Sequence, residues 1–271
     1  PAAEGIDHDA LAPEAAPTAS SRGTELIRLH DFPAGARAGN LIHKVFELLD
    51  FGAPRAELAA IVERQLGRYS IEAKWADTLS DAIADVLDAD LPVEPGLRLR
   101  HLPRQQRLDE MEFLLPVIGE GSRLNPASLA ETFARHASAA VSQGYADSLQ
   151  RLRFAELHGF LKGFVDLVFV HGERWYVVDY KSNRLGLHRS DYSQARMQRE
   201  MCDHHYFLQY HLYVVALQRH LRLRLPGYDY QRHFGGVLYL FVRGMAAGVP
   251  NGIFADRPSR PMIDALDELL R

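Results

Sequence analysis

Two neighbouring segments of this chain are apolar on both faces, and they limit the fold more than any other feature. Residues 160–170 and 175–181 are rich in β-branched and aromatic side chains, and the four residues between them have the length of a hairpin loop. A strand with apolar side chains on both faces is typical of the interior of a sheet. The sequence therefore predicts an antiparallel hairpin at the centre of a sheet rather than a half-exposed one.

The segments on either side of this hairpin have their own periodicity. Their spacing predicts helices over residues 41–49, 55–69, 71–87, 126–142 and 205–221, and further strands over 110–117 and 234–242. Residues 1–33 are rich in Ala, Pro, Ser and Gly and are predicted to form a flexible linker or tail. The folded part then divides into a mainly helical region, residues 34–109, and a core, residues 110–271.

Two aspartates face each other across the predicted hairpin. A symmetric turn centred between Gly172 and Glu173 places Asp166 opposite Asp179, and opposed residues of an antiparallel pair share one face of the sheet. Directly opposed carboxylates repel, so they require a counter-ion, a shared proton or a bound cation. Mg²⁺ meets this requirement, because it prefers octahedral oxygen coordination with few protein carboxylates and keeps positions for water and a phosphate oxygen.

Lys181 joins this pair because side chains alternate along a strand, which puts it on the same face as Asp179. An ammonium group beside the metal can orient a water or hydroxide and offset charge on a phosphorane-like transition state. Asp166, Asp179 and Lys181 therefore indicate hydrolysis of phosphodiester bonds. A solvated ion-pair ladder is the alternative interpretation. The apolar flanks of both strands weigh against it, since buried charges are seldom kept without a partner or a task.

Other candidate residues lie on the predicted helices. His43 projects away from the apolar stripe of its helix, together with Glu47 one turn later, and is either a ligand or half of an exposed His–Glu pair. Gln209 and Tyr213 share a helix face at spacing i, i+4, where they either reach a phosphate backbone or form a polar helix edge. Tyr180 is predicted to pack on the rear face of its strand.

The charge distribution is uneven along the chain. The net charge is −4, but the stretch from Lys181 to Arg243 holds ten basic and four acidic residues. Within it, Arg222 and Arg224 alternate beside the last predicted strand, where phosphate contact and simple solvation both explain them. Such asymmetry is compatible with one face directed toward a polyanion, and equally with a solvated basic surface that has no partner.

Composition narrows the class of protein. Hydrophobic residues make up 47% and charged residues 24%, which is ordinary for a globular chain. The single cysteine, Cys202, cannot close an intramolecular disulfide or supply a four-cysteine metal site, and this suits a reducing compartment. The sequence contains no run of 18 apolar residues and no signal-peptide pattern at its start, so we expect a cytoplasmic protein without membrane association. Because it begins with Pro, we expect a processed product or a piece of a longer chain.

Five blocks of residues occur in the order that one known family shows. They are Gly39-Asn-Leu-Ile-His43 with Glu47, Gly163-Phe-Val-Asp166, Val177-Val-Asp-Tyr-Lys-Ser182, Leu208-Gln-Tyr-His-Leu-Tyr213, and the segment from Tyr228 to Gly244. This Gly-x-x-Asp, Asp-x-Lys and Gln-x-x-x-Tyr series resembles the RecB-type nucleases of the PD-(D/E)XK superfamily. The last block resembles the end of the RecB subunits of bacterial RecBCD helicase–nucleases, and the likeness covers about residues 26–271.

The resemblance implies an α/β fold, with a central mixed β-sheet flanked by helices as in restriction endonucleases and an N-terminal helical region. It implies a Mg²⁺-dependent deoxyribonuclease, with Mn²⁺ or Ca²⁺ as alternative occupants of the metal site. The implied metal ligands are His43, Asp166, Asp179 and the backbone carbonyl of Tyr180. Lys181 would activate water, while Gln209 and Tyr213 would support the site or contact DNA.

The resemblance also implies a setting for this activity. The parent chain would carry ATP-driven helicase domains and act in double-strand break repair by recombination, with DNA, RecC-like and RecD-like subunits and RecA as partners. A non-catalytic module that docks DNA or RecA on the nuclease fold is a second hypothesis, and an RNA-cleaving or freestanding repair nuclease is a third. The residues do not separate exonuclease from endonuclease action or one strand polarity from the other.

Overall fold

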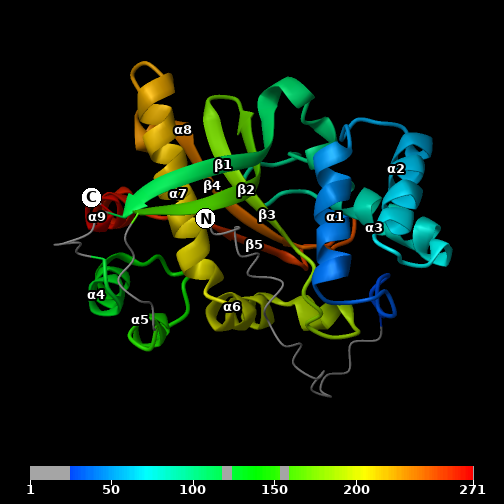
Figure 1. The fold of residues 1–271 in the computed structure, drawn as a ribbon, viewed down its shortest axis with the longest axis horizontal. Coiled ribbons are helices and arrows are strands. Elements are labelled where there is room, and N and C mark those ends of the chain that lie inside the picture. The colour runs from blue at the N-terminus through cyan, green and yellow to red at the C-terminus, as the bar shows by residue number, and fades with distance from the viewer. Residues whose placement is uncertain (1–24, 118–123, 153–158, 271) are drawn as a thin grey trace.

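The computed structural model describes residues 25–117, 124–152 and 159–270 and shows one mixed sheet with helices on both faces (Figure 1). Across these ranges the sheet order is β1-β2-β3-β4-β5, and every neighbouring pair is antiparallel except β3 with β4. The predicted α/β plan, a central mixed sheet flanked by helices, is confirmed. The strands are β1 (Arg107–Val117), β2 (Gly159–His171), β3 (Arg174–Lys181), β4 (Phe234–Phe241) and β5 (Ile253–Asp256).

The helices follow the predicted order in the first half of the chain. The second half contains more helices than the sequence predicted. Helices α5 (Tyr145–Leu149), α6 (Gln194–Asp203), α8 (Tyr230–His233) and α9 (Arg260–Leu269), together with strand β5, were not expected from the sequence. The α-helices are α1 (Ala36–Leu48), α2 (Arg55–Arg68), α3 (Ala76–Asp88), α4 (Pro126–His136), α5 (Tyr145–Leu149), α6 (Gln194–Asp203), α7 (Tyr206–Arg224), α8 (Tyr230–His233) and α9 (Arg260–Leu269). Short 3₁₀ turns lie at Ala73–Trp75, Leu99–His101, Arg104–Gln106, Arg189–Tyr192 and Val242–Gly244.

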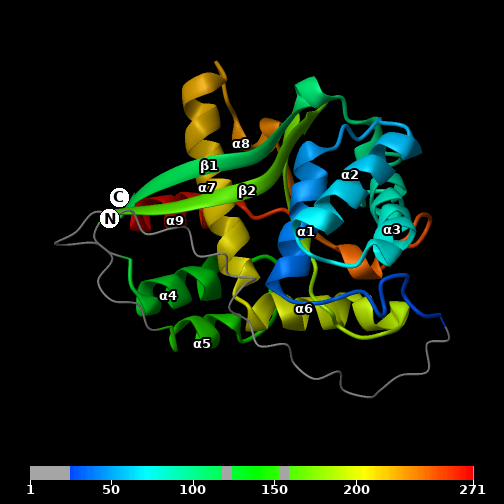
Figure 2. The ribbon, with the colours of Figure 1, turned by 45° about the vertical axis from the view of Figure 1, so that its right-hand side comes forward.

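The sheet separates two apolar clusters, as strand alternation requires for an interior hairpin. On one face, Tyr176, Val178 and Tyr180 of β3 pack in a cluster with residues of α1, α2 and α3. On the other, Val177 of β3 packs with residues of α4, α6, α7 and α9. Figure 2 shows α1, α2 and α3 gathered on one side of the sheet and α4, α6 and α9 on the other. Both faces of the hairpin are therefore covered.

The segment just before α1 packs into the body of the protein. Ile27, Leu29 and Phe32 are buried, although the sequence placed residues 1–33 in a flexible linker. The buried guanidinium of Arg243 explains this, because it donates hydrogen bonds to the carbonyls of Leu29 and Phe32 at 2.9 and 3.2 Å. Its Nε also donates to the carbonyl of Ser182 at 2.7 Å, so one side chain joins the approach to α1 to the end of β3.

The hairpin has the predicted register, but its turn has two residues instead of the predicted four. The pairs run from His171↔Arg174 to Leu167↔Val178, so the numbers of paired residues follow the symmetric turn between Gly172 and Glu173. Gly172 has φ +59°, a conformation that glycine adopts at little cost in a two-residue turn. The ladder ends at Leu167↔Val178, immediately before Asp166 and Asp179. Beyond that point β2 pairs with β1, and the two strands form a long ribbon that crosses α7 (Figures 1 and 2).

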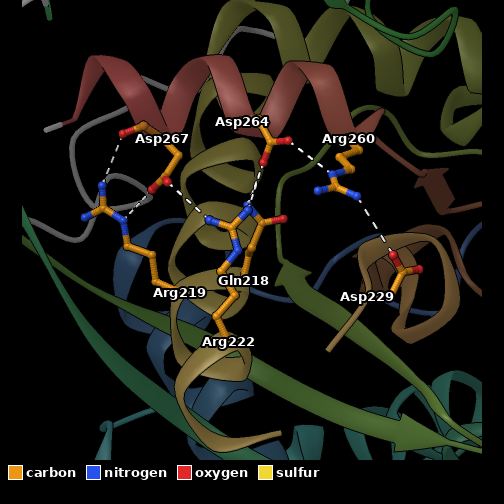
Figure 3. Close-up of polar contacts among 7 residues, drawn as sticks. All are labelled: Gln218, Arg219, Arg222, Asp229, Arg260, Asp264 and Asp267. Atoms are coloured by element: carbon orange, nitrogen blue, oxygen red, sulfur yellow. Dashed lines mark hydrogen bonds and ion pairs between the residues drawn. The ribbon is translucent and has the colours of Figure 1, made fainter. Parts of the chain in front are cut away.

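Ion pairs between charged side chains join α9 to α7 (Figure 3). Arg219 Nε donates to Asp267 Oδ1, and Arg222 reaches both Asp267 Oδ2 at 3.5 Å and Asp264 Oδ1 at 3.0 Å. Arg260 Nε donates to Asp264 Oδ2 at 3.2 Å. The side chain of Asp267 is 3% exposed and that of Asp264 is 37% exposed. Since exposed ion pairs are screened by water, Asp267 should carry most of the stabilisation.

Replacing Asp267 with asparagine should lower the free energy of unfolding by about 2–3 kcal/mol, because two arginines lose a charged acceptor that water does not reach. The matched change Asp264→Asn, one turn away on α9, should cost about 1 kcal/mol or less. Urea unfolding of both variants measures the difference. Equal losses for the two variants would show that burial of Asp267 does not set the strength of this contact.

Candidate active site

The candidate site lies at the fork where β2 leaves β3. Asp166 occupies this point, and its Oδ2 accepts a hydrogen bond from the backbone N–H of Tyr180 at 2.8 Å. Its Oδ1 lies 3.2 Å from Nδ1 of His43, which comes from α1. The structure therefore brings His43 next to Asp166, two residues that are more than a hundred positions apart in the chain.

Helix α1 places His43 beside Asp166 because the apolar face of this helix packs against the sheet. Ile42, Val45 and Phe46 are buried, whereas His43 is only partly buried, as the helical spacing predicted. A Cβ atom on Gly39 would lie 3.0 Å from Oγ of Ser182, so the small residue lets α1 approach the end of β3 closely. The helix is thus held beside the residue that follows Lys181.

Asp179 and Lys181 form a buried ion pair on the other side of β3. Lys181 Nζ lies 2.8 Å from Asp179 Oδ2, and each side chain is 3% exposed. The ammonium also lies 4.0 Å from the ring centroid of Tyr206 and 5.5 Å from that of Tyr239. Aromatic faces attract a cation, so the two rings hold the ammonium group in place while Asp179 balances its charge.

Tyr180 points to the opposite face of β3 and packs as predicted. Its ring stacks on Phe46 of α1 with centroids 4.0 Å apart and planes 3° apart, and its side chain is buried. Burial raises the pKa of its hydroxyl well above the usual range, and the charge of Asp166 adds to this effect. The ring therefore anchors α1 to β3, while its backbone N–H binds the Asp166 carboxylate.

Sequence reasoning missed Glu110. It lies between the pairs Asp109↔Leu167 and Met111↔Val165, so it stands across from Asp166, and its φ is +50°. Burial raises the pKa of its carboxyl, and the neighbouring carboxylate of Glu47 raises it further. A left-handed backbone at a residue other than glycine often marks a functional position, and no local sequence pattern predicts it here.

Gln209 and Tyr213 lie on α7 behind the ion pair. Gln209 Oε1 accepts a hydrogen bond of 2.8 Å from the hydroxyl of Tyr239, one of the two rings beside Lys181. The ring of Tyr213 packs against Phe113 with centroids 5.6 Å apart, and its side chain is buried. Gln209 thus fixes a ring that contacts the ammonium, whereas Tyr213 supports the packing of α7 on β1.

The two arginines predicted to alternate beside the last strand are instead helical. Arg222 and Arg224 lie in the last turn of α7, and Arg222 binds Asp264 and Asp267 of α9. With a rise of about 1.5 Å per residue, Arg222 stands roughly 24 Å along the helix from Tyr206, which contacts Lys181. The structure does not bring this pair to the fork.

The predicted metal ligands are of the right chemical type but are divided into two pairs. Within the described ranges, no three His, Cys, Asp or Glu side chains are grouped as a metal site. His43 and Asp166 supply an imidazole nitrogen and a carboxylate oxygen 3.2 Å apart, while the Asp179 carboxylate contacts Lys181. Two carboxylates with one imidazole suit a hard divalent cation such as Mg²⁺ or Mn²⁺, so the donor set fits the predicted ion.

No helix in the described part of the chain has the length and apolar character needed to cross a bilayer.

Comparison with known proteins gives one consistent family. Residues 22–268 match the model of the PD-(D/E)XK nuclease superfamily. The chain is 40% identical over 257 residues to "RecBCD enzyme subunit RecB" of Escherichia coli strain K12, covering 94% of this chain and 21% of that protein. It is 36% identical over 239 residues to the RecB subunit of Haemophilus influenzae, covering 88% of this chain and 18% of the relative. For the RecB subunit of Mycobacterium tuberculosis strain H37Rv, the identity is 37% over 294 residues, covering 100% of this chain and 27% of the relative.

This chain therefore spans about a fifth to a quarter of the curated relatives that it matches. The match extends over both the helical region and the sheet, and it includes His43, Asp166, Asp179 and Lys181. A family model that covers nearly all of the described fold leaves no room for a different domain type. The chain belongs to the PD-(D/E)XK nuclease superfamily and is a homologue of the RecB subunit of RecBCD enzymes.

Proposed function

We propose that this chain is a metal-dependent deoxyribonuclease domain that hydrolyses phosphodiester bonds of DNA at the fork between β2 and β3. The observation that carries the proposal is that the paired strands β2 and β3 carry the His43–Asp166 contact and the buried Asp179–Lys181 pair just beyond the point where their ladder ends. Membership in a nuclease superfamily supports it. Acidic and imidazole donors beside a buried ammonium are the groups that phosphodiester hydrolysis needs.

Each residue has a role that follows from its surroundings. His43, Asp166, Asp179 and the Tyr180 carbonyl would hold a divalent cation, for which we propose Mg²⁺ as the working ion and Mn²⁺ or Ca²⁺ as substitutes. The bound ion supplies Lewis-acid chemistry and a more acidic water. Lys181, fixed by the rings of Tyr206 and Tyr239, directs a positive charge toward the phosphate that is attacked.

The supporting residues shape this site. The partly buried carboxyl of Glu110, whose pKa is raised by burial and by the carboxylate of Glu47, stands across from Asp166. Gln209 keeps the Tyr239 ring in position through its 2.8 Å hydrogen bond. Because Arg222 and Arg224 lie at the far end of α7, we propose that any contact they make with DNA is remote from the scissile bond.

The names of the relatives suggest the wider setting. We infer that the chain works as the nuclease part of a RecB-like protein, in recombinational repair, with RecC-like and RecD-like subunits as partners. ATP-driven helicase domains in the same parent protein and contact with RecA belong to this proposal. A chain with one thiol and DNA as substrate suits the cytoplasm.

A metal titration on DNA tests the proposed activity. Labelled linear single-stranded and duplex DNA are incubated with the protein in EDTA and then with increasing Mg²⁺, Mn²⁺ or Ca²⁺. Cleavage that begins only when Mg²⁺ or Mn²⁺ is present is the expected result. DNA binding without cleavage under every metal condition would favour the non-catalytic docking module instead.

Replacing His43 with alanine should weaken Mn²⁺ binding by about tenfold or more, because loss of a group that binds or orients a metal ligand has effects of this size. Isothermal titration calorimetry measures the affinity. The control is His171→Ala, a half-exposed histidine beside the hairpin turn that contacts Glu94. Unchanged Mn²⁺ affinity in the His43 variant would remove this residue from the ligand set.

A further inference from the structure

The ribbon of β1 and β2 carries exposed aromatic side chains on its outer face. Beyond the fork, the inner face packs Val165 and Leu115 against the cluster that contains α7, so that side of the ribbon is covered. The outer face alternates Phe160, Lys162 and Phe164 along β2, and the two phenylalanines are 71% and 42% exposed. Large aromatic side chains are costly to leave in water, so a row of them on one strand face indicates a binding surface.

This face begins at the candidate active site. Val165 is fully buried on the inner side, so its neighbour Phe164 lies on the outer side of β2, and the contact of Asp166 with His43 of α1 puts Asp166 on that side as well. At about 3.3 Å per residue, Phe164 lies roughly 7 Å and Phe160 roughly 20 Å from Asp166 along the strand. In Figures 1 and 2 the ribbon runs from the α1 side of the molecule across α7, and no helix of the described residues lies over its outer face.

The residues between the rings fit a nucleic-acid backbone. Lys162 Nζ lies 5.3 Å from the ring centroid of Phe164 and 2.9 Å from Oε1 of Glu112 across the ribbon. Both members of that ion pair are more than 40% exposed, so the pair is weak and the ammonium can turn to a phosphate. An aromatic–lysine–aromatic order along one strand offers a stacking face, a positive charge and a second stacking face in succession.

We propose that the outer face of the β1–β2 ribbon binds single-stranded DNA and leads it to the candidate active site. Bases stack on Phe160 and Phe164, and Lys162 contacts the backbone between them. Single strands are favoured over duplex DNA because their bases have free faces, whereas bases in a duplex are already stacked on each other. The proposal rests on the proposed nuclease function, since it places the bound strand beside Asp166.

Binding in the absence of metal tests this surface apart from catalysis. The 271-residue protein is titrated into a fluorescently labelled oligothymidylate in EDTA, and anisotropy gives the dissociation constant. The double variant Phe160→Ala/Phe164→Ala should weaken binding at least about tenfold, because stacking contributes this much per base. A duplex of the same length should bind with little dependence on these residues.

Two further variants separate stacking from general apolar contact. Phe160→Trp/Phe164→Trp should bind at least as tightly as the wild type, while Phe160→Leu/Phe164→Leu should bind as weakly as the alanine variant. The control is Leu223→Ala, which removes another exposed apolar side chain, on α7, and should not change the affinity. Circular dichroism checks that each variant is folded.

The outcomes distinguish this proposal from the nuclease assignment. Unchanged oligothymidylate affinity in the alanine variant, or no binding by the wild type, overturns the ribbon proposal, whatever the cleavage assay shows. A change in oligomeric state by light scattering, with DNA affinity intact, assigns the face to a protein contact and also overturns it. Phenylalanine-dependent binding without metal-stimulated cleavage supports the ribbon and contradicts the nuclease function.

Discussion

Replacing Asp179 with alanine should abolish metal-dependent DNA cleavage, a loss of at least about a thousandfold. The carboxylate is 3% exposed and lies 2.8 Å from the Lys181 ammonium, which it holds in one orientation, and in the proposed function it also binds the cation. Its removal should also lower the melting temperature, because the buried ammonium then keeps only the rings of Tyr206 and Tyr239, so cleavage is assayed well below that temperature. Cleavage of end-labelled linear DNA in Mg²⁺, together with a thermal melt, measures both effects.

A matched control is available in the chain. Asp191 is also buried and pairs with Arg196, but it lies in the 3₁₀ turn Arg189–Tyr192 and not at the fork. Asp191→Ala should keep most of the activity when it is assayed well below its melting temperature. Cleavage at the wild-type rate by the Asp179 variant would refute the active-site assignment. A comparable loss in both variants would attribute the effect to general damage to the fold.

The hairpin was predictable because two independent signals agreed. Apolar side chains on both faces required an interior position, and the turn at Gly172 and Glu173 set the register that the pairs from Leu167↔Val178 onward follow. The sequence could not show that the ladder stops just before the two aspartates. That fork depends on the ribbon following β1 across α7, and this choice is made by packing between distant segments rather than by local pattern.

The elements that were missed carry weak local signals. Helix α6 buries only Met197 and Met201 among polar residues, so its apolar stripe is too sparse to stand out. Strand β5 has four residues, which is short for a periodicity argument. The alternation of arginine and leucine after Leu221 imitates a strand, but α7 continues there because α9 supplies the acidic partners of Arg222.

The site residues also include some that local sequence patterns predict and some that they do not. Strand alternation predicted that Asp179 and Lys181 share one face of β3, which agrees with their 2.8 Å contact, and helical spacing gave the outward direction of His43. The predicted pairing of Asp166 with Asp179 lies beyond the last recorded pair, and Asp166 contacts His43 and the Tyr180 backbone. Glu110 could not be predicted from the sequence, because nothing in its local pattern indicates a left-handed backbone that brings its carboxyl near Glu47 and Asp166. Tertiary placement decided which polar residues meet, and short-range pattern decided only which way each one points.

The buried pair also predicts that metal and lysine stabilise the same carboxylate. Replacing Lys181 with methionine keeps a long apolar stem against Tyr206 and Tyr239 but leaves Asp179 without its ammonium. In EDTA this variant should lose about 3–5 kcal/mol of unfolding free energy, the usual cost of an uncompensated buried charge.

Added Mg²⁺ should recover part of that loss, because a cation bound at Asp179 replaces the missing charge and binding to the folded state raises its stability. The Mg²⁺-induced rise in melting temperature should therefore be larger for Lys181→Met than for the wild type, and it should shrink again in the double variant Asp179→Asn/Lys181→Met. Differential scanning calorimetry with and without Mg²⁺ makes the comparison. If the metal raises the melting temperature of all three proteins equally, Asp179 is not a ligand, and the two pairs at the fork do not form one site.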